Sequence, residues 1–151
     1  NDEMNMISST QCPMKHQKLV AHVLGVPYHK VHCKTKRIGG GFGGKETRSA
    51  FVACAAAVPA HVLKRPVRIC LDRDEDMAMT GHRHAFLCKY KVGFNDDGRI
   101  VAYKANFYNN GGNSLDLSHA IMDRCLFHAD SAYNIDHMSV TGNVCFTNTP
   151  S

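Results

Sequence analysis

The feature that most restricts the fold of this sequence is a glycine-dense segment at residues 39–44, which contains five glycines and one phenylalanine. Glycine has no Cβ atom, so it reaches positive φ angles and lets another group approach the backbone amides closely. Residues 31–36 before the segment alternate in polarity and predict a strand, and the Ala-rich residues from about Thr47 predict a helix that ends or kinks near Pro59. A strand, such a loop and a helix N-terminus together predict a site for an anion or for the polar edge of a cofactor.

The rest of the chain predicts a mixed α/β fold of strands and packed helices, with no repeat and no linker. The first half of the chain predicts a strand before residue 10, a helix through residues 16–25 and a strand at 67–72. The helix has Pro13 near its first turn and Ser9 or Thr10 as its cap. The second half predicts a hairpin that joins 85–94 to 100–108 through a turn at 95–98, a break in the second strand at 109–112, a helix at 117–127 and a strand at 138–146. A chain of 151 residues is long enough for a sizeable core, so we expect one domain or part of one.

The composition excludes several classes of protein. With 44% apolar and 21% charged residues, the chain is expected to be soluble and globular rather than disordered. No apolar stretch approaches the roughly 20 residues that a membrane-spanning helix needs, so we expect no membrane partner. The net charge of +5 is mild and the 18 Lys and Arg residues are scattered, so a nucleic-acid partner is not expected either. Both ends of the sequence are abrupt, and we expect a piece of a longer protein.

The seven cysteines raise the question of a disulfide framework or a metal site. A zinc site or an iron–sulfur cluster normally needs at least one close pair of cysteines, such as CxxC, and no two of these cysteines lie close together. We therefore expect free, buried thiols in a reducing compartment.

Two other patterns suggest a metal site and fail on inspection. Asp72, Asp74 and Asp76 match the DxDxD start of a calcium-binding loop. However, Met77 and Arg83 stand where that loop needs Gly and Glu. His82 and His84 have no third ligand nearby, so we expect structural histidines that form hydrogen bonds.

The glycine segment also partly matches two nucleotide-binding patterns. Residues 39–44 fit the dinucleotide fingerprint GxGxxG, but the acid expected about twenty residues later appears only at Asp72. With Lys45 the segment also resembles the phosphate loop of NTPases, yet Glu46 stands where that loop needs Ser or Thr, and its carboxylate would repel a polyphosphate. A nucleotide-binding module built on the glycine loop therefore stays an alternative.

Longer strings carry a more specific signal. They are STQ at 9–11, IGGGFGGKETRS at 38–49, RPVRICLDRDEDM at 65–77, TGHRH at 80–84, NNGGNSLDLS at 109–118 and NVCFTNTPS at 143–151. In these strings, which are spread over essentially the whole chain, the sequence resembles the molybdenum-cofactor domain of the xanthine dehydrogenase and aldehyde oxidase family. The strings KHQK and TGHRH look most like plant members. The resemblance implies that residues 1–151 are a partial molybdopterin-binding domain of a larger multidomain oxidoreductase.

The resemblance implies which residues meet the cofactor. Gln11 corresponds to the glutamine that hydrogen-bonds an oxygen ligand of molybdenum, and its amide is a neutral donor suited to that task. Gly41, Phe42 and Gly43 correspond to the loop whose backbone lies against the pterin and the metal's ligands. Gln11 and Phe42 are thus expected to form the environment of the molybdenum.

The resemblance also implies two substrate-binding residues. Glu46 corresponds to the glutamate that hydrogen-bonds a purine, and Arg124 to the arginine that binds its other end and stabilises the negative charge that develops there. From the residues alone, Glu46 is an ordinary acid in the first turn of a helix, and Arg124 is a surface residue paired with Asp116 or Asp123. Aldehyde oxidases typically have altered residues at the positions of Glu46 and Arg124. The chain therefore resembles a purine hydroxylase, with aldehyde oxidase as the alternative.

The implied reactions are hydroxylation of hypoxanthine to xanthine and of xanthine to urate. Electrons are expected to pass to two 2Fe–2S clusters, FAD and NAD in the remaining domains of the same polypeptide. The general base is expected in a later segment, so we predict no catalytic residue within residues 1–151 and no activity of this chain alone. A homodimer in the cytoplasm, or in the peroxisome, is the expected state of the intact protein.

Overall fold

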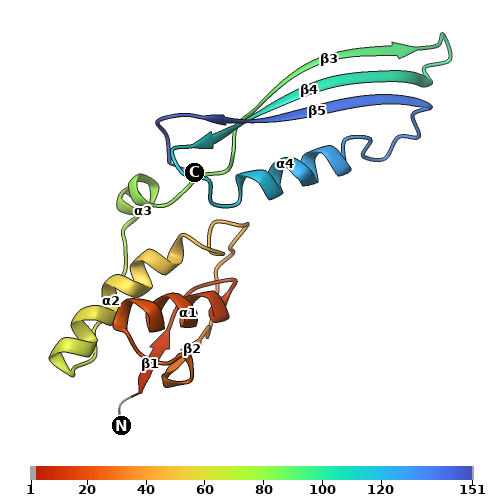
Figure 1. The fold of residues 1–151 in the computed structure, drawn as a ribbon. Coiled ribbons are helices and arrows are strands. Elements are labelled where there is room, and N and C mark those ends of the chain that lie inside the picture. Colours follow the sequence, from red (N-terminus) through yellow and green to blue (C-terminus); the bar gives the residue numbers. More distant parts are fainter. Residues whose placement is uncertain (1–2, 151) are drawn as a thin grey trace. The chain divides into compact units, whose positions relative to one another are not determined.

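The structure is a computed structural model that describes residues 3–150 (Figure 1). The chain divides into two compact units, unit 1 (Asn1–Gly81) and unit 2 (His82–Ser151). Each unit has its own sheet and its own helices, so the mixed α/β fold class is confirmed.

Unit 1 is built on two short parallel strands, β1 (Met4–Ile7) and β2 (Val31–Lys34). Parallel neighbours cannot be joined by a tight turn and need a crossover connection. Helix α1 (Pro13–Leu24) and the short 3₁₀ helix η1 (Tyr28–Lys30) form this connection. Both strands and the helix between them were expected from the sequence and are confirmed.

Pro13 and Gly25 mark the two ends of helix α1 as predicted, but the predicted N-terminal cap is not formed. Pro13 stands at the first turn, where a missing N–H costs nothing. Gly25 ends the helix with φ 66°, a left-handed conformation that glycine reaches without strain. The expected cap by Ser9 or Thr10 is wrong: the residue at the cap position is Cys12, and no side chain caps the helix. The Thr10 hydroxyl is used instead in the loop network described below.

The core of unit 1 lies between α1, β2 and the helix α2 (Ser49–Leu63). Its buried apolar residues are Val20, Ala21, Val31, Ala53 and Ala57. Helix α2 does not end at Pro59 but continues to Leu63. Proline removes one helical hydrogen bond, and the burial of two alanines of α2 in the shared core stabilises the helix against that loss.

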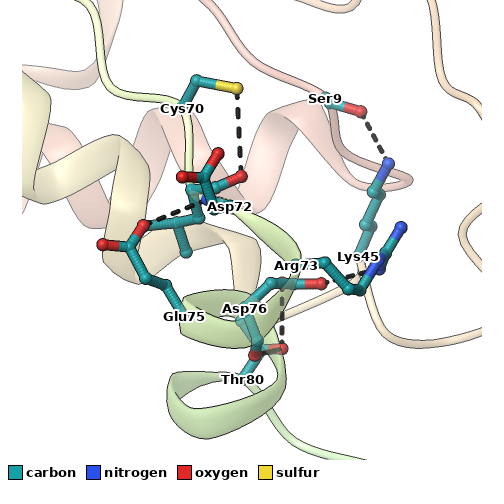
Figure 2. A network of polar contacts seen from close by, with 9 residues as sticks. Ser9, Lys45, Cys70, Asp72, Arg73, Glu75, Asp76 and Thr80 are labelled. Atoms are coloured by element: carbon teal, nitrogen blue, oxygen red, sulfur yellow. Dashed lines mark hydrogen bonds and ion pairs between the residues drawn. The ribbon is translucent and has the colours of Figure 1, made fainter.

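The strand expected at residues 67–72 is wrong, because this stretch forms no strand. A strand needs a neighbour for its hydrogen bonds, and no segment of residues 3–150 pairs with it. Helix α3 (Arg73–Met79) follows and starts with a capping box, in which the Asp72 N–H donates to the Glu75 carboxylate at 3.0 Å (Figure 2). The acids after Asp72 are therefore acids of a helix N-terminus, as expected, and not calcium ligands.

Unit 2 contains a three-stranded sheet of β3 (Phe86–Phe94), β4 (Ile100–Gly112) and β5 (His137–Phe146). Strand β4 is central, antiparallel to β3 and parallel to β5 (Figure 1). The predicted hairpin is confirmed, with Gly98 at φ 83° in its turn. Helix α4 (Ser118–Phe127) lies in the crossover between the two parallel strands.

The break expected at residues 109–112 is wrong, because β4 continues through them. Its pairing with β5 extends to Gly112 opposite Phe146. The asparagine side chains bond locally instead of ending the strand. The Asn109 amide donates to the Ser118 carbonyl at 3.3 Å, and the Asn110 side-chain oxygen accepts from the Gly112 N–H at 3.2 Å.

The expectation of free, buried thiols is half right. All seven cysteines are free, but none is fully buried: six are half-buried and Cys70 is exposed. Cys54 packs against the apolar core of unit 1. His84 forms the expected structural hydrogen bond, to the Ser118 hydroxyl at 2.8 Å. Within residues 3–150 no group of three or more His, Cys, Asp and Glu residues is placed to hold a metal ion. No helix in the same range is both long and apolar enough to cross a membrane.

Candidate functional site

The candidate site lies where β1 and β2 end. The two strands are parallel, so their carboxyl ends meet at one edge of the sheet, the edge at which open α/β sheets bind ligands. The chain that leaves β1 leads to Gln11, and the chain that leaves β2 leads to the glycine loop at 39–44. The Ser8 N–H donates to the Lys34 carbonyl at 3.0 Å and so extends the pairing past the strand ends.

The glycine loop has a backbone that few residues other than glycine adopt. Gly40 and Gly43 have φ angles of 107° and 86°. Phe42 between them also has a positive φ, of 51°, which is uncommon for a residue with a side chain. The Phe42 side chain is 96% exposed. The loop therefore presents its backbone and one aromatic ring outward.

The Gln11 side chain is clamped by this loop. Its Oε1 accepts hydrogen bonds from the backbone N–H groups of Gly43 at 3.0 Å and Lys45 at 3.3 Å. A Cβ atom at Gly41 would lie 2.4 Å from the Gln11 Cδ, so only glycine leaves room for the amide. Because the oxygen is held by two donors, the amide orientation is fixed. Its Nε2 makes no hydrogen bond within residues 3–150 and remains an available donor.

The carbonyl of Lys45 joins the Gln11 segment to the loop. It accepts from the Gln11 N–H at 2.9 Å and from the Thr10 hydroxyl at 2.8 Å. The Ser49 hydroxyl at the start of α2 lies 3.2 Å from the same oxygen. The end of the loop is thus fixed by groups from two other segments of unit 1.

His16 lies between these two hydroxyls and was missed by the sequence reasoning. Its side chain is fully buried, with Nδ1 at 3.1 Å from the Thr10 hydroxyl and Nε2 at 3.1 Å from the Ser49 hydroxyl. Burial lowers the pKa of His16 below its ordinary value, and hydrogen bonds at Cys12 and Ser49 partly oppose that shift. The available signal was its place four residues before Val20, on the buried face of α1.

Glu46 lies in the turn between the glycine loop and α2. Its N–H donates to the Gly43 carbonyl at 3.3 Å, but its carboxylate makes no ion pair or hydrogen bond within residues 3–150. The neighbouring Lys45 ammonium donates to the Ser9 hydroxyl at 3.0 Å instead (Figure 2). Since α2 starts only at Ser49, the interpretation of Glu46 as an acid in the first helical turn is wrong.

Arg124 lies in unit 2, on an exposed face of α4. Its guanidinium makes no ion pair or hydrogen bond among the residues that the structure describes, so the pairing with Asp116 or Asp123 is wrong. Helix α4 contacts β5 at Gly142, where a Cβ atom would lie 2.4 Å from the Met122 Sδ. The position of Arg124 therefore depends on close helix-to-sheet packing.

The whole sequence, which includes the glycine loop and helix α4, matches one family model. The model describes the molybdopterin cofactor-binding domain, and it matches residues 1–151. The chain belongs to this family.

Several xanthine dehydrogenases are similar to the chain over nearly its whole length. The chain is 65% identical to xanthine dehydrogenase 1 of Arabidopsis thaliana over 149 residues, 61% identical to xanthine dehydrogenase of Oryza sativa subsp. japonica over 150 residues, and 55% identical to xanthine dehydrogenase/oxidase of Rattus norvegicus over 149 residues. Each match covers 99% of this chain and 11% of the relative. The similarity to xanthine dehydrogenases, with plant members above the rat protein, was expected from the sequence and is confirmed.

Solved structures show the same fold. Quinoline 2-oxidoreductase from Pseudomonas putida 86 matches with a TM-score of 0.78 at 25% identity, over 96% of this chain and 19% of that chain. Aldehyde oxidoreductase from Desulfovibrio gigas matches with a TM-score of 0.78 at 23% identity, over 95% of this chain and 16% of that chain. The fold of the chain is therefore shared with these two oxidoreductases.

The residues of unit 1 fit the cofactor that the family name implies. The Gln11 Nε2 is a fixed donor without a partner among residues 3–150, and an oxygen-bearing group is what such a donor binds. Cβ atoms at Gly39 and Gly43 would meet nothing within 4 Å, so space is open beside the loop backbone. A polar group can therefore approach both the loop and the amide.

Proposed function

We propose that this chain is the part of a xanthine dehydrogenase that binds the molybdenum cofactor and contacts the purine. The intact protein would hydroxylate hypoxanthine to xanthine and xanthine to urate. The clamped Gln11 amide is the observation that carries this proposal, since its free donor lies beside an open glycine loop. The names of the relatives support the choice of reaction.

Gln11 and the loop would hold the molybdenum–pterin group. When bound, that group supplies oxygen transfer from water and takes up the electrons of the reaction. Gln11 Nε2 would donate to an oxygen atom of the group, and the backbone from Gly41 to Gly43 would lie along it. The exposed Phe42 ring would cover the group from one side and exclude water.

Glu46 and Arg124 would bind the purine. A purine carries N–H donors and ring or carbonyl acceptors, so a carboxylate can accept from the donors and a guanidinium can donate to the acceptors. Neither side chain has a partner within residues 3–150, which leaves both available for a ligand. The guanidinium would also stabilise negative charge that develops on the purine during hydroxylation.

The remaining machinery would come from the rest of the polypeptide, because the chain spans 11% of its curated relatives. That machinery comprises the general base, two 2Fe–2S clusters, FAD and NAD. We infer that residues 1–151 alone do not hydroxylate xanthine, and that the intact protein is a homodimer of the cytoplasm or the peroxisome.

The full-length protein tests the proposal. We expect molybdenum and pterin in the purified protein and turnover of xanthine in preference to benzaldehyde. Glu46→Val and Arg124→Met should each lower kcat/KM for xanthine roughly 100-fold or more, because each removes a group that binds the purine or stabilises its developing charge. Lys104→Met, which removes an exposed cation from β4, is the control and should leave turnover unchanged.

Each contrary result identifies a different error. Turnover of benzaldehyde but not of xanthine would indicate an aldehyde oxidase. Tight nucleotide binding without molybdenum or pterin would indicate a nucleotide-binding module. Unchanged xanthine turnover in both variants would show that Glu46 and Arg124 do not bind the purine.

A further inference from the structure

The hydrogen positions around His16 follow from what each neighbour is able to donate. The Thr10 hydroxyl has one proton and two lone pairs. Its proton goes to the Lys45 carbonyl at 2.8 Å, because a carbonyl only accepts. Its oxygen accepts from the Cys12 N–H at 3.0 Å and lies 3.1 Å from His16 Nδ1. His16 Nδ1 is therefore the donor of that contact and carries a hydrogen.

A second acceptor supports the same assignment. His16 Nδ1 also lies 3.2 Å from the Cys12 carbonyl, which can only accept. One hydrogen on Nδ1 thus serves two oxygen atoms, one from the Thr10 side chain and one from the backbone. Burial favours the neutral ring, which then has a lone pair on Nε2.

That lone pair determines where the Ser49 proton goes. The Lys45 carbonyl already accepts from the Thr10 hydroxyl and the Gln11 N–H, whereas the Nε2 lone pair has no other donor among residues 3–150. The Ser49 hydroxyl lies 3.2 Å from that crowded oxygen and 3.1 Å from His16 Nε2. Its proton therefore goes to His16, and the imidazole connects the hydroxyls on the two sides of the loop end.

We propose that His16 is a positioning residue of the candidate site. As the neutral ring with a hydrogen on Nδ1, it orients the Thr10 hydroxyl that holds the Lys45 carbonyl, and it ties that hydroxyl to Ser49 at the start of α2. The Lys45 N–H holds the Gln11 Oε1, and the Glu46 N–H is tied to the Gly43 carbonyl. The imidazole thus acts on Gln11 and Glu46 without touching cofactor or substrate. The inference rests on the proposed function, in which those two residues meet the cofactor and the purine.

The test uses full-length protein and two measurements, the rate of molybdenum–pterin release on dilution and kcat for xanthine. His16→Phe removes both ring nitrogens, whereas His16→Asn keeps a donor near the position of Nδ1. His22→Phe is the control, since His22 lies exposed on the same helix. We expect His16→Phe to release the cofactor about 10-fold faster and to lower kcat by about 10- to 100-fold, because small misplacements of this kind are costly. His16→Asn should lie between His16→Phe and the wild type.

A double-variant cycle distinguishes positioning from a general loss of stability. If His16 acts through Gln11, His16→Phe should accelerate release much less in a Gln11→Ala background than in the wild type. Independent, multiplying effects would overturn the inference. If His16→Phe does not accumulate as folded protein, Ser49→Ala removes the other end of the same contact and should show the same dependence on Gln11.

The two proposals fail in different ways. A wild-type protein without molybdenum and pterin overturns the proposed function and this inference with it. A cofactor-loaded wild type whose release rate is unaffected by His16→Phe overturns this inference alone.

Discussion

The two units hold their candidate site residues by different physical means. In unit 1, directional hydrogen bonds fix Gln11 and the end of the glycine loop from two sides. In unit 2, Arg124 is placed by the packing of α4 on the sheet, where Met122 lies against Gly142. Unit 1 also has the larger apolar core: among the described residues of unit 2, the buried apolar residues are Ala105 and Met122.

Because of this difference, the two units should respond differently to substitutions. Hydrogen bonds depend steeply on distance and angle, so the site in unit 1 should respond to changes of a single atom. Packing depends on volume, so unit 2 should respond to added or removed bulk and tolerate polar changes at its surface. The following experiments compare the two units on these terms, and the largest expected effect comes first.

Gly41→Ala should have the largest effect. The new Cβ atom would lie 2.4 Å from both Cδ and Oε1 of Gln11, so the amide must leave its two backbone donors. We expect a fall of roughly 100-fold in kcat/KM for xanthine in the full-length protein. Gly93→Ala on β3 is the control, because a Cβ atom there makes only an ordinary contact, 3.6 Å from the Ala102 Cβ. Equal losses in the two variants would mean that the loop does not act through Gln11.

Gly142→Ala is the corresponding change in unit 2. A Cβ atom there would lie 2.4 Å from the Met122 Sδ and 3.1 Å from a methyl carbon of Leu126, so α4 must move away from β5. Overpacking of this kind costs about 1–3 kcal/mol. Hydrogen exchange of the α4 amides in the intact protein should speed up accordingly.

Gly93→Ala on β3 is the control for that measurement. A Cβ atom at Gly93 would lie 3.6 Å from the Ala102 Cβ, an ordinary contact. If hydrogen exchange in α4 were the same in Gly142→Ala and Gly93→Ala, the position of α4 would not depend on its packing against Gly142.

A fall in pH should weaken unit 1 through His16. Burial holds the pKa of His16 below its ordinary value of 6.5 in the folded state, so the unfolded chain binds the proton more readily. The stability that this group contributes is fully present above about pH 6.5 and is lost as the pH falls through the folded-state pKa. Hydrogen exchange of α1 and α2, corrected for the intrinsic rate, should rise over this range.

A His16→Gln variant should show a shallower rise, because glutamine does not titrate. His22→Gln, on the exposed side of the same helix, should behave like the wild type. The pH effect would belong to other groups if His16→Gln followed the wild-type curve.

The smallest effect is expected at the ion pair of Arg99 with Asp136 in unit 2. One guanidinium nitrogen lies 3.2 and 3.0 Å from the two carboxylate oxygens, but both side chains are largely solvent-exposed. An exposed pair contributes about 0–1 kcal/mol. Asp136→Asn should therefore change exchange in the β3–β4 hairpin only slightly, and added salt should remove the difference. A large, salt-independent change would show that polar surface contacts hold unit 2 after all.

Local patterns predicted those elements that local residues determine. The turn at 95–98, the glycine loop and the helix stop at Gly25 all follow from backbone preferences of single residues. The strand expected at 67–72 failed because strand formation also needs a neighbour, which a single segment does not reveal. The length of β4 was underestimated for the same reason. Its residues 109–112 would end an isolated strand, but here they pair with β5.

The candidate site was predicted only in part. The resemblance supplied the roles proposed for Gln11, Glu46 and Arg124, which the experiments above test. The spacing of residues alone did not suggest how Gln11 is clamped, since the contact joins segments about thirty residues apart in the sequence. His16 escaped notice because a histidine on the apolar face of a helix is usually a core residue, and its partners Thr10 and Ser49 come from other segments.

The pairing of β1 with β2 has a consequence for the accuracy of the whole site. The two strands pair over only four residues each, from Met4 opposite Val31 to Ile7 opposite Lys34. A slip by one residue would shift one strand end past the other by about 3.3 Å and turn every side chain of the shifted strand to the opposite face. That distance is longer than the 3.0 Å bond between Gln11 and Gly43, so the clamp would be lost even with every side chain intact. The position of Gln11 relative to the glycine loop therefore depends on the register of two very short strands.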